Sequence, residues 1–71
     1  MEYQEKYDKL IKMTTEDFEI DGKVYNLSDD FDKFFVKGNK AAGGRIRKVM
    51  QELKKLAQEV RTDVQAYKNT L

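Results

Sequence analysis

Apolar residues in the second half of the chain recur at alternating spacings of four and three. This pattern holds for more than three repeats and is typical of the a and d positions of a coiled coil. These positions form the heptad seam: Ile46, Met50, Leu53, Ala57, Val60, Val64, Tyr67 and Leu71. Val49 and Leu56 widen the seam at adjoining positions. The pattern predicts one long helix over residues 37–71.

The length of this helix predicts an assembly. At about 1.5 Å per residue, thirty helical residues would span roughly 45 Å, and a chain of 71 residues cannot bury so long a face alone. An isologous second copy would cover what one chain cannot. We therefore expect a homodimer or higher oligomer, with an interface made of Ile46, Met50, Leu53, Ala57, Val60, Val64 and Tyr67.

The first half of the chain predicts a short amphipathic helix over residues 2–13. Tyr3, Tyr7, Leu10 and Ile11 have the spacing of one helix face. The threonines at positions 14 and 15 continue a helix poorly, so we expect it to end there.

Residues 17–27 carry the strongest hairpin signal in the sequence. Asp21-Gly22 favours a two-residue turn, because glycine accepts the positive φ that a type I′ turn requires. The flanks are rich in β-branched and aromatic residues, and the turn would place Ile20 opposite Lys23 and Phe18 opposite Tyr25. The alternative is an ordered loop with the same turn. Whether a hairpin would pack within its own chain or on a second copy stays open at this point.

A second helix is predicted after Ser28, a residue suited to the N-cap position. The phenylalanines of this helix have helical spacing and are expected to lie in the core under the long helix: Phe31, Phe34 and Phe35. Gly38 is expected to end the helix and Asn39 to cap the next one. This connection is short enough to make a helical hairpin.

The long helix opens with the small residues Ala41-Ala42-Gly43-Gly44. Each glycine inside a helix costs about 1 kcal/mol relative to alanine, so the pair requires a reason. Another backbone could approach closely there, or a phosphate could approach the helix N-terminus. The glycines do not form a P-loop, since no Gly-Lys-Ser/Thr follows them.

Charge divides the sequence into two halves. Residues 1–36 hold ten acidic and five basic side chains, whereas residues 37–71 hold nine basic and three acidic ones. Along the long helix a basic residue recurs every seven positions, and this basic row consists of Lys40, Arg47, Lys54, Arg61 and Lys68. The division indicates either that the halves neutralise one another or that the basic surface binds a polyanion.

Composition excludes most kinds of chemistry. The chain has no cysteine and no histidine, so it lacks disulfides, thiolate metal sites, the usual general base and the usual zinc ligand. The acidic residues between positions 16 and 21 do not follow the calcium-loop pattern. We expect no enzyme activity, no cofactor, no metal site, no small-molecule substrate and no membrane segment, and a cytoplasmic location.

The run KGNKAAGGRIRK, residues 37–48, resembles the signature of bacterial linker-histone-like proteins, the chlamydial-type histone-like family. The leucines and basic residues that follow it, up to Arg61, continue in the same manner, and the resemblance covers about residues 30–68. It implies a small nucleoid protein that binds DNA with little sequence preference. The shared motif includes Lys37, Lys40, Arg45, Arg47 and Lys48. The acidic residues 1–36 form an extension that either mediates assembly or masks the basic edge.

Together these patterns predict a single, mainly α domain over residues 1–71. An acidic N-terminal extension of helix and hairpin, residues 1–27, would precede a histone-like helical hairpin, residues 28–71, in a dimeric helical bundle. The predicted function is non-specific binding and compaction of double-stranded DNA in a bacterial nucleoid. The predicted phosphate contacts are Lys37, Lys40, Arg45, Arg47, Lys48, Lys54, Lys55 and Arg61.

The alternative function is a protein-interaction or oligomerisation module. In that case the basic row would be neutralised by Asp29, Asp30 and Asp32 or by an acidic protein partner. Lys48 and Lys55 are expected to point to solvent under either hypothesis.

Overall fold

The computed structural model describes residues 2–71, with side chains from Gln4 onward, so the predicted position of Tyr3 lies outside the described side chains. The chain is mainly helical and measures 49 × 19 × 16 Å. Its elements in chain order are α1 (Glu2–Thr15), β1 (Asp17–Ile20), β2 (Lys23–Asn26), α2 (Leu27–Phe31), the π-helical turn η1 (Asp32–Val36) and α3 (Lys40–Lys68).

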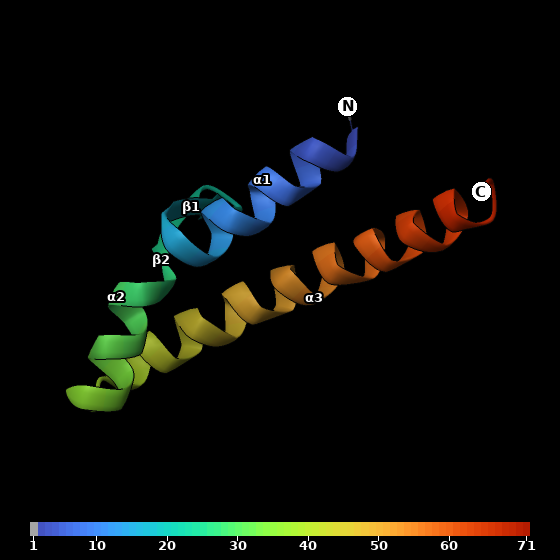
Figure 1. Ribbon diagram of the computed structural model, residues 1–71. Helices are drawn as coiled ribbons and strands as arrows, with labels where there is room; N and C mark the ends of the chain where they lie inside the picture. Colours follow the sequence, from blue (N-terminus) through green and yellow to red (C-terminus); the bar gives the residue numbers. More distant parts are fainter. Residues whose placement is uncertain (1) are drawn as a thin grey trace.

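Helix α3 runs the full length of the molecule (Figure 1). Helix α1 lies beside it with its first residues toward the C-terminal end of α3, and α2 and η1 fold against the other end (Figure 1). An ion pair between Lys6 and Asp63 ties α1 to α3 near the end of this antiparallel contact. None of the helices within residues 2–71 is long and apolar enough to cross a membrane.

The hairpin forms as the sequence predicts. Strands β1 and β2 pair with Phe18 opposite Tyr25 and Ile20 opposite Lys23. Asp21 and Gly22 both have positive φ, 51° and 81°, as a type I′ turn requires. Ile20 is buried in the core, so the hairpin packs within its own chain and not across two copies. This packing supplies the support that an isolated two-stranded hairpin lacks in water.

The core lies on one side of α3 and consists of Met13, Ile20, Val49 and Leu56. The half-buried Leu10, Phe18, Tyr25, Leu27, Leu53 and Val60 pack around it. On α3 the most buried line is Ala42, Val49 and Leu56, which are seven residues apart and therefore share nearly the same angle on the helix. The residues predicted only to widen the seam thus lie at the centre of the buried face.

The residues predicted to form the oligomer interface therefore fall into two groups, one packed on the chain's own core and one exposed. Leu53 and Val60 pack on their own chain's core, and Ile46 is half-buried. Met50, Ala57, Val64 and Tyr67 remain exposed. Prediction and structure differ because α1, the hairpin and α2 all approach α3 from one side. The apolar spacing along α3 does not reveal which side of the helix they cover.

Two of the three predicted helix boundaries in this region are confirmed. Gly38 has a φ of +71° and ends the helical turn before it, and the side chain of Asn39 accepts from the backbone N–H groups of Ala41 and Ala42. The predicted N-cap at Ser28 is wrong. Asn26, at the extended end of β2, instead accepts from the backbone N–H of Asp29, so the helix begins one residue before Ser28.

The phenylalanines depart most from the prediction of a buried aromatic face. Phe34 is half-buried over Gly43, whereas Phe31 and Phe35 are exposed. Phe34 and Phe35 lie within η1, whose π-helical turn is wider than that of an α-helix and changes their angles around the axis relative to Phe31 at the end of α2. The helical spacing of the three rings therefore does not give three core residues.

Candidate nucleic-acid interface

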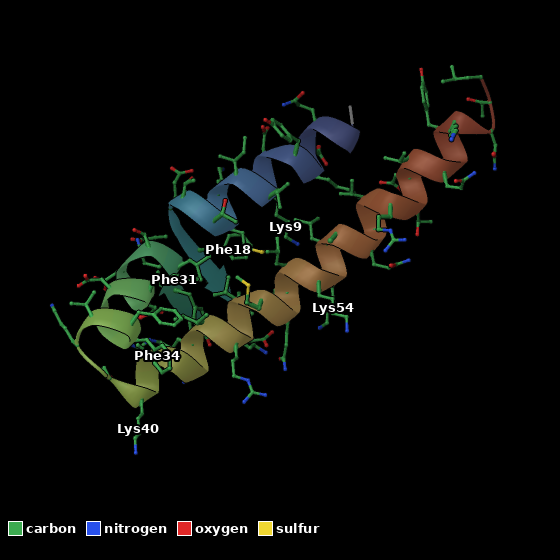
Figure 2. The ribbon with its side chains drawn as sticks, turned by 60° about the horizontal axis from the view of Figure 1, so that its bottom comes forward. Lys9, Phe18, Phe31, Phe34, Lys40 and Lys54 are labelled. Atoms are coloured by element: carbon green, nitrogen blue, oxygen red, sulfur yellow. The ribbon has the colours of Figure 1, made fainter. Side chains whose placement is uncertain are left out.

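The basic row lies on the surface of α3. Lys40 and Lys54 extend from α3 away from α1, the hairpin and α2 (Figure 2). All five members are exposed: Lys40, Arg47, Lys54, Arg61 and Lys68. Within the described residues none of them forms an ion pair. Seven residues of helix rise by about 10 Å and fall about 20° short of two full turns, so the row is a line of cations at that interval that winds slowly around α3.

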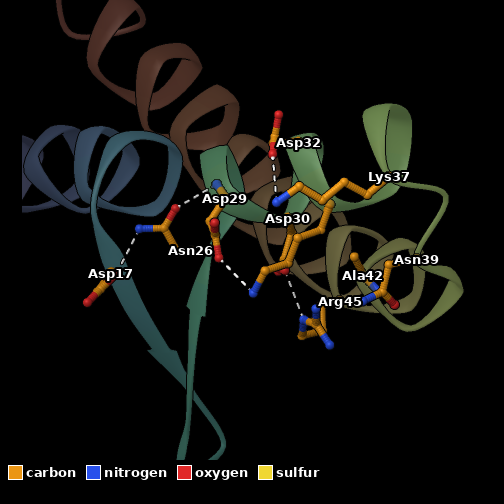
Figure 3. Close-up of polar contacts among 10 residues, drawn as sticks. Asp17, Asn26, Asp29, Asp30, Asp32, Lys37, Asn39, Ala42 and Arg45 are labelled. Atoms are coloured by element: carbon orange, nitrogen blue, oxygen red, sulfur yellow. Dashed lines mark hydrogen bonds and ion pairs between the residues drawn. The ribbon is translucent and has the colours of Figure 1, made fainter.

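Three other predicted phosphate contacts are engaged by acids of the first half of the chain, and Figure 3 shows two of them, at Lys37 and Arg45. Lys37 lies 3.7 Å from Asp32. Arg45 lies 2.9 Å from Asp30. Lys48 lies 3.2 Å from Asp21. The structure therefore separates the predicted contacts into a paired group and the basic row.

The pair of Arg45 and Asp30 is the most buried of these contacts. Asp30 is 3% exposed, and its carboxylate accepts from the Arg45 guanidinium across 2.9 Å. A buried carboxylate without a cationic partner would carry a large desolvation cost. This contact therefore gives Arg45 a structural role in joining α2 to α3.

Lys48, which was predicted to point to solvent, is half-exposed and is paired with an acid. The hairpin turn brings Asp21 beside it, and the hydrogen bond and charge of Asp21 raise the pKa of Lys48 above its usual value. Lys55, by contrast, is exposed and lies 3.4 Å from Glu52 on its own helix. The Lys48 pair joins residues 27 positions apart in the sequence, so only the packing of the hairpin on α3 could reveal it.

The acids of α2 and η1 also have partners away from the basic row. Asp29 pairs with Lys33 at 2.9 Å, Asp30 with Arg45 and Asp32 with Lys37. Asn26 links this region to β1 by donating to Asp17 (Figure 3). The described acids of the first half of the chain thus neutralise some of its basic residues, but none of the five cations of the basic row.

A comparison with family models gives a match over residues 4–70 to the family described as histone H1-like protein Hc1. The chain belongs to this family. Its members are DNA-binding nucleoid proteins and do not form an enzyme family. The match extends well beyond the motif at residues 37–48 and takes in the acidic first half. No curated protein and no solved structure matched the chain.

The two glycines of the Hc1-family motif have different surroundings. A Cβ atom at Gly43 would lie 2.6 Å from the ring of Phe34, so close approach of this ring explains the glycine. A Cβ atom at Gly44 would meet nothing within 4 Å. Gly44 follows Lys40 by four residues and precedes Arg47 by three, which places it on the same face as the start of the basic row.

The described part of this Hc1-family chain holds no cluster of three or more acidic side chains that could bind a metal ion. Its buried polar side-chain atoms all have hydrogen-bond partners. The described surface presents the exposed cations of the basic row along α3.

Proposed function

We propose that this protein binds double-stranded DNA in a bacterial nucleoid through the basic row of α3, with little sequence preference, and thereby helps to organise or compact the DNA. The observation that carries the proposal is the row itself. Five cations point to solvent from one continuous helix, and no acid of the described chain pairs with them. Membership of the histone H1-like Hc1 family supports the same function.

The spacing of the row suits a polyanion better than a defined small ligand. B-DNA carries one negative charge per about 1.7 Å of its axis, so cations at intervals of about 10 Å find phosphates in any register. Contacts of this kind position a protein on the duplex but do not read bases. We therefore propose Lys40, Arg47, Lys54 and Arg61 as the main phosphate contacts, with Lys68 continuing the row.

The remaining predicted contacts have smaller roles in this proposal. Lys55 is exposed and holds only a helix neighbour, so it is free to exchange that partner for phosphate. Lys37 and Lys48 would have to leave an exposed aspartate first. Arg45 is held at Asp30 through its Nε, and leaving Asp30 would strand a buried carboxylate, so we propose a structural role for it and not a main phosphate contact.

The rival function, a protein-interaction module, would pair the basic row with acids of the chain or of a partner. The positions of Asp29, Asp30 and Asp32 favour DNA binding over the internal form of this rival, because all three have other partners. An acidic protein partner remains the competing ligand class in the test below.

We also propose that the protein self-associates as a dimer or larger assembly. The support is the exposed part of the heptad seam, since apolar residues at a and d positions typically meet another helix. Met50, Ala57, Val64, Tyr67 and Leu71 make up this part. Self-association would let one assembly bind several DNA segments.

Fluorescence anisotropy on a random-sequence duplex, at several salt concentrations, tests DNA binding. Each neutralised phosphate lowers the logarithm of the association constant by about 0.9 per decade of salt, so a row of four or five cations predicts a slope of roughly −4. A second duplex of unrelated sequence should give the same constant. Absence of binding at low salt would refute the proposal and favour the protein-interaction module.

A further inference from the structure

The buried stripe of α3 continues beyond the part of the chain that covers it. Residues up to Val60 pack on the core, but every residue from Arg61 to the end of the helix is exposed. Val64 and Tyr67 follow Val60 at spacings of four and three and so extend the same face. We name Val64 and Tyr67 the uncovered stripe. Tyr67 is 67% exposed, an unusual position for an aromatic ring on an apolar helix face.

The opposite end of the molecule carries a second apolar patch. Phe35 is 68% and Val36 75% exposed, and the ring of Phe31 lies 5.4 Å from that of Phe35. We name Phe31, Phe35 and Val36 the aromatic tip. Phe35 and Val36 lie in the π-helical turn η1, and Phe31 lies in α2 directly before it; π-helical turns are rare and recur at functional sites. The two patches lie at opposite ends of a rod 49 Å long (Figures 1 and 2).

We infer that the aromatic tip of one copy packs on the uncovered stripe of the next, in a head-to-tail contact. The patches match in chemistry, since Tyr67 would meet phenylalanine rings and aromatic pairs contribute beyond the area that they bury. Within one chain the same kinds of surface already meet, because Phe34 of η1 packs on α3 over Gly43. A second copy would repeat that helix contact near the C-terminal end of α3.

The charges around the two patches also match. Segments α2 and η1 carry three aspartates against one lysine, whereas residues 61–68 of α3 carry Arg61 and Lys68 against Asp63. Asp29 and Asp32 are more than half exposed, and their partners are neighbouring lysines on the surface. Arg61 and Lys68 have no ion pair within the described residues. Opposite charges at the rim would orient tip and stripe toward one another.

A head-to-tail contact uses two different surfaces, so it does not close on itself and can add copies without limit. Each patch is small, which predicts a weak contact in free solution. The inference rests on the self-association proposed above but not on DNA binding. On DNA, successive copies would place their basic rows in series along the duplex.

Sedimentation velocity of the full chain without DNA, over a series of protein concentrations, tests the contact. The weight-average mass should rise past that of a dimer for the original chain and stay at one chain for Phe35→Glu and for Tyr67→Glu. An equimolar mixture of the two variants retains one intact tip and one intact stripe, so it should form dimers and stop there. Val24→Glu, which alters an exposed apolar residue of the hairpin, is the matched control and should behave as the original chain.

Three results would overturn the inference. These are a single chain at every concentration, loss of assembly in only one of the two variants, and no dimer in the mixture. The first would also refute self-association, whereas the second would indicate an isologous contact through one patch. Circular dichroism verifies helix content, and Phe35→Ser and Tyr67→Ser replace the glutamates if a charged variant loses it.

Discussion

Arg45 Nε donates a hydrogen bond to Asp30 Oδ1 across 2.9 Å, and this contact joins α2 to the first turns of α3. The carboxylate is buried, while the arginine side chain is 37% exposed. The arginine thus neutralises a buried charge from the rim of the core. Of the two arginines in the Gly-Arg-Ile-Arg run, one serves the fold and the other, Arg47, is exposed on the basic row.

We expect Arg45→Gln to destabilise the fold by about 1–3 kcal/mol, because it leaves Asp30 buried without a cation. Arg47→Gln should change the free energy of unfolding by less than about 0.5 kcal/mol, as exposed substitutions usually do. Urea denaturation followed by circular dichroism measures both. Equal destabilisation by the two variants would show that Arg45 has no special structural role.

The glycine pair predicts stability changes of opposite sign. Gly43→Ala would push a methyl group into the ring of Phe34 and should destabilise the fold by about 1–3 kcal/mol. Gly44→Ala meets open space and should stabilise it by about 0.5–1 kcal/mol through helix propensity. Thermal unfolding of the two variants provides the comparison.

Gly44→Ala also tests how closely DNA approaches α3. If the duplex lies along the start of the basic row, the added methyl group should weaken DNA binding although the fold is more stable. Anisotropy at one salt concentration measures this effect. Unchanged affinity would place the duplex farther along the row, toward Arg61.

The basic row can be tested as a unit with a triple substitution, Arg47→Gln, Lys54→Gln and Arg61→Gln. We expect the fold to remain intact and the salt slope of DNA binding to fall by about 2.7, which corresponds to three lost phosphate contacts. A matched triple at Lys9, Lys12 and Lys23 removes the same charge from exposed lysines outside the row. Similar losses of affinity in both triples would mean that net charge, and not the row, governs binding.

The pair of Lys48 and Asp21 predicts a gain of binding. Asp21→Asn keeps a residue that tolerates the positive φ of this turn and removes the charge that holds Lys48. We expect tighter DNA binding and a salt slope steeper by up to about 0.9, since one more lysine becomes available. Asp8→Asn removes one exposed acid elsewhere and is the control; an equal gain there would point to net charge alone.

The same pair has a defined pH dependence. Asp21 raises the pKa of Lys48 above its value in the unfolded chain, so the pair contributes to stability below the ordinary lysine pKa. That contribution disappears as the pH rises through the higher pKa of the folded state. Across the neutral range, the difference in stability between the original chain and Asp21→Asn should therefore stay constant in pH-dependent denaturation.

Local features of this protein could be predicted from the sequence because neighbours along the chain decide them. The Asp21-Gly22 turn fixed the strand register, Gly38 ended a helix, and Asn39 capped α3. The motif at residues 37–48 pointed to the family that the chain belongs to. The Asn26 cap was missed, although an asparagine before an acidic turn is an equally good capping signal.

The contacts of the candidate interface depended on tertiary structure. A basic residue every seven positions predicted a row along α3, but the sequence could not show which of its cations have acidic partners. The packing of the hairpin brought Asp21 to Lys48, and the fold-back of α2 brought Asp30 to Arg45. Those two contacts pair two of the predicted residues with acids. The sequence could not show this, because spacing along the chain does not encode how separate elements lie against one another.

The sequence by itself determined the long helix, its row of cations and the turn that joins the strands, since helical periodicity and turn chemistry act over a few residues. Tertiary structure decided which side of α3 became the core. Val49 and Leu56 lie at its centre because α1, the hairpin and α2 all approach from that side. Tyr67 lies beyond the part of α3 that these elements cover and stays exposed, and Phe35 stays exposed at the opposite end of the molecule.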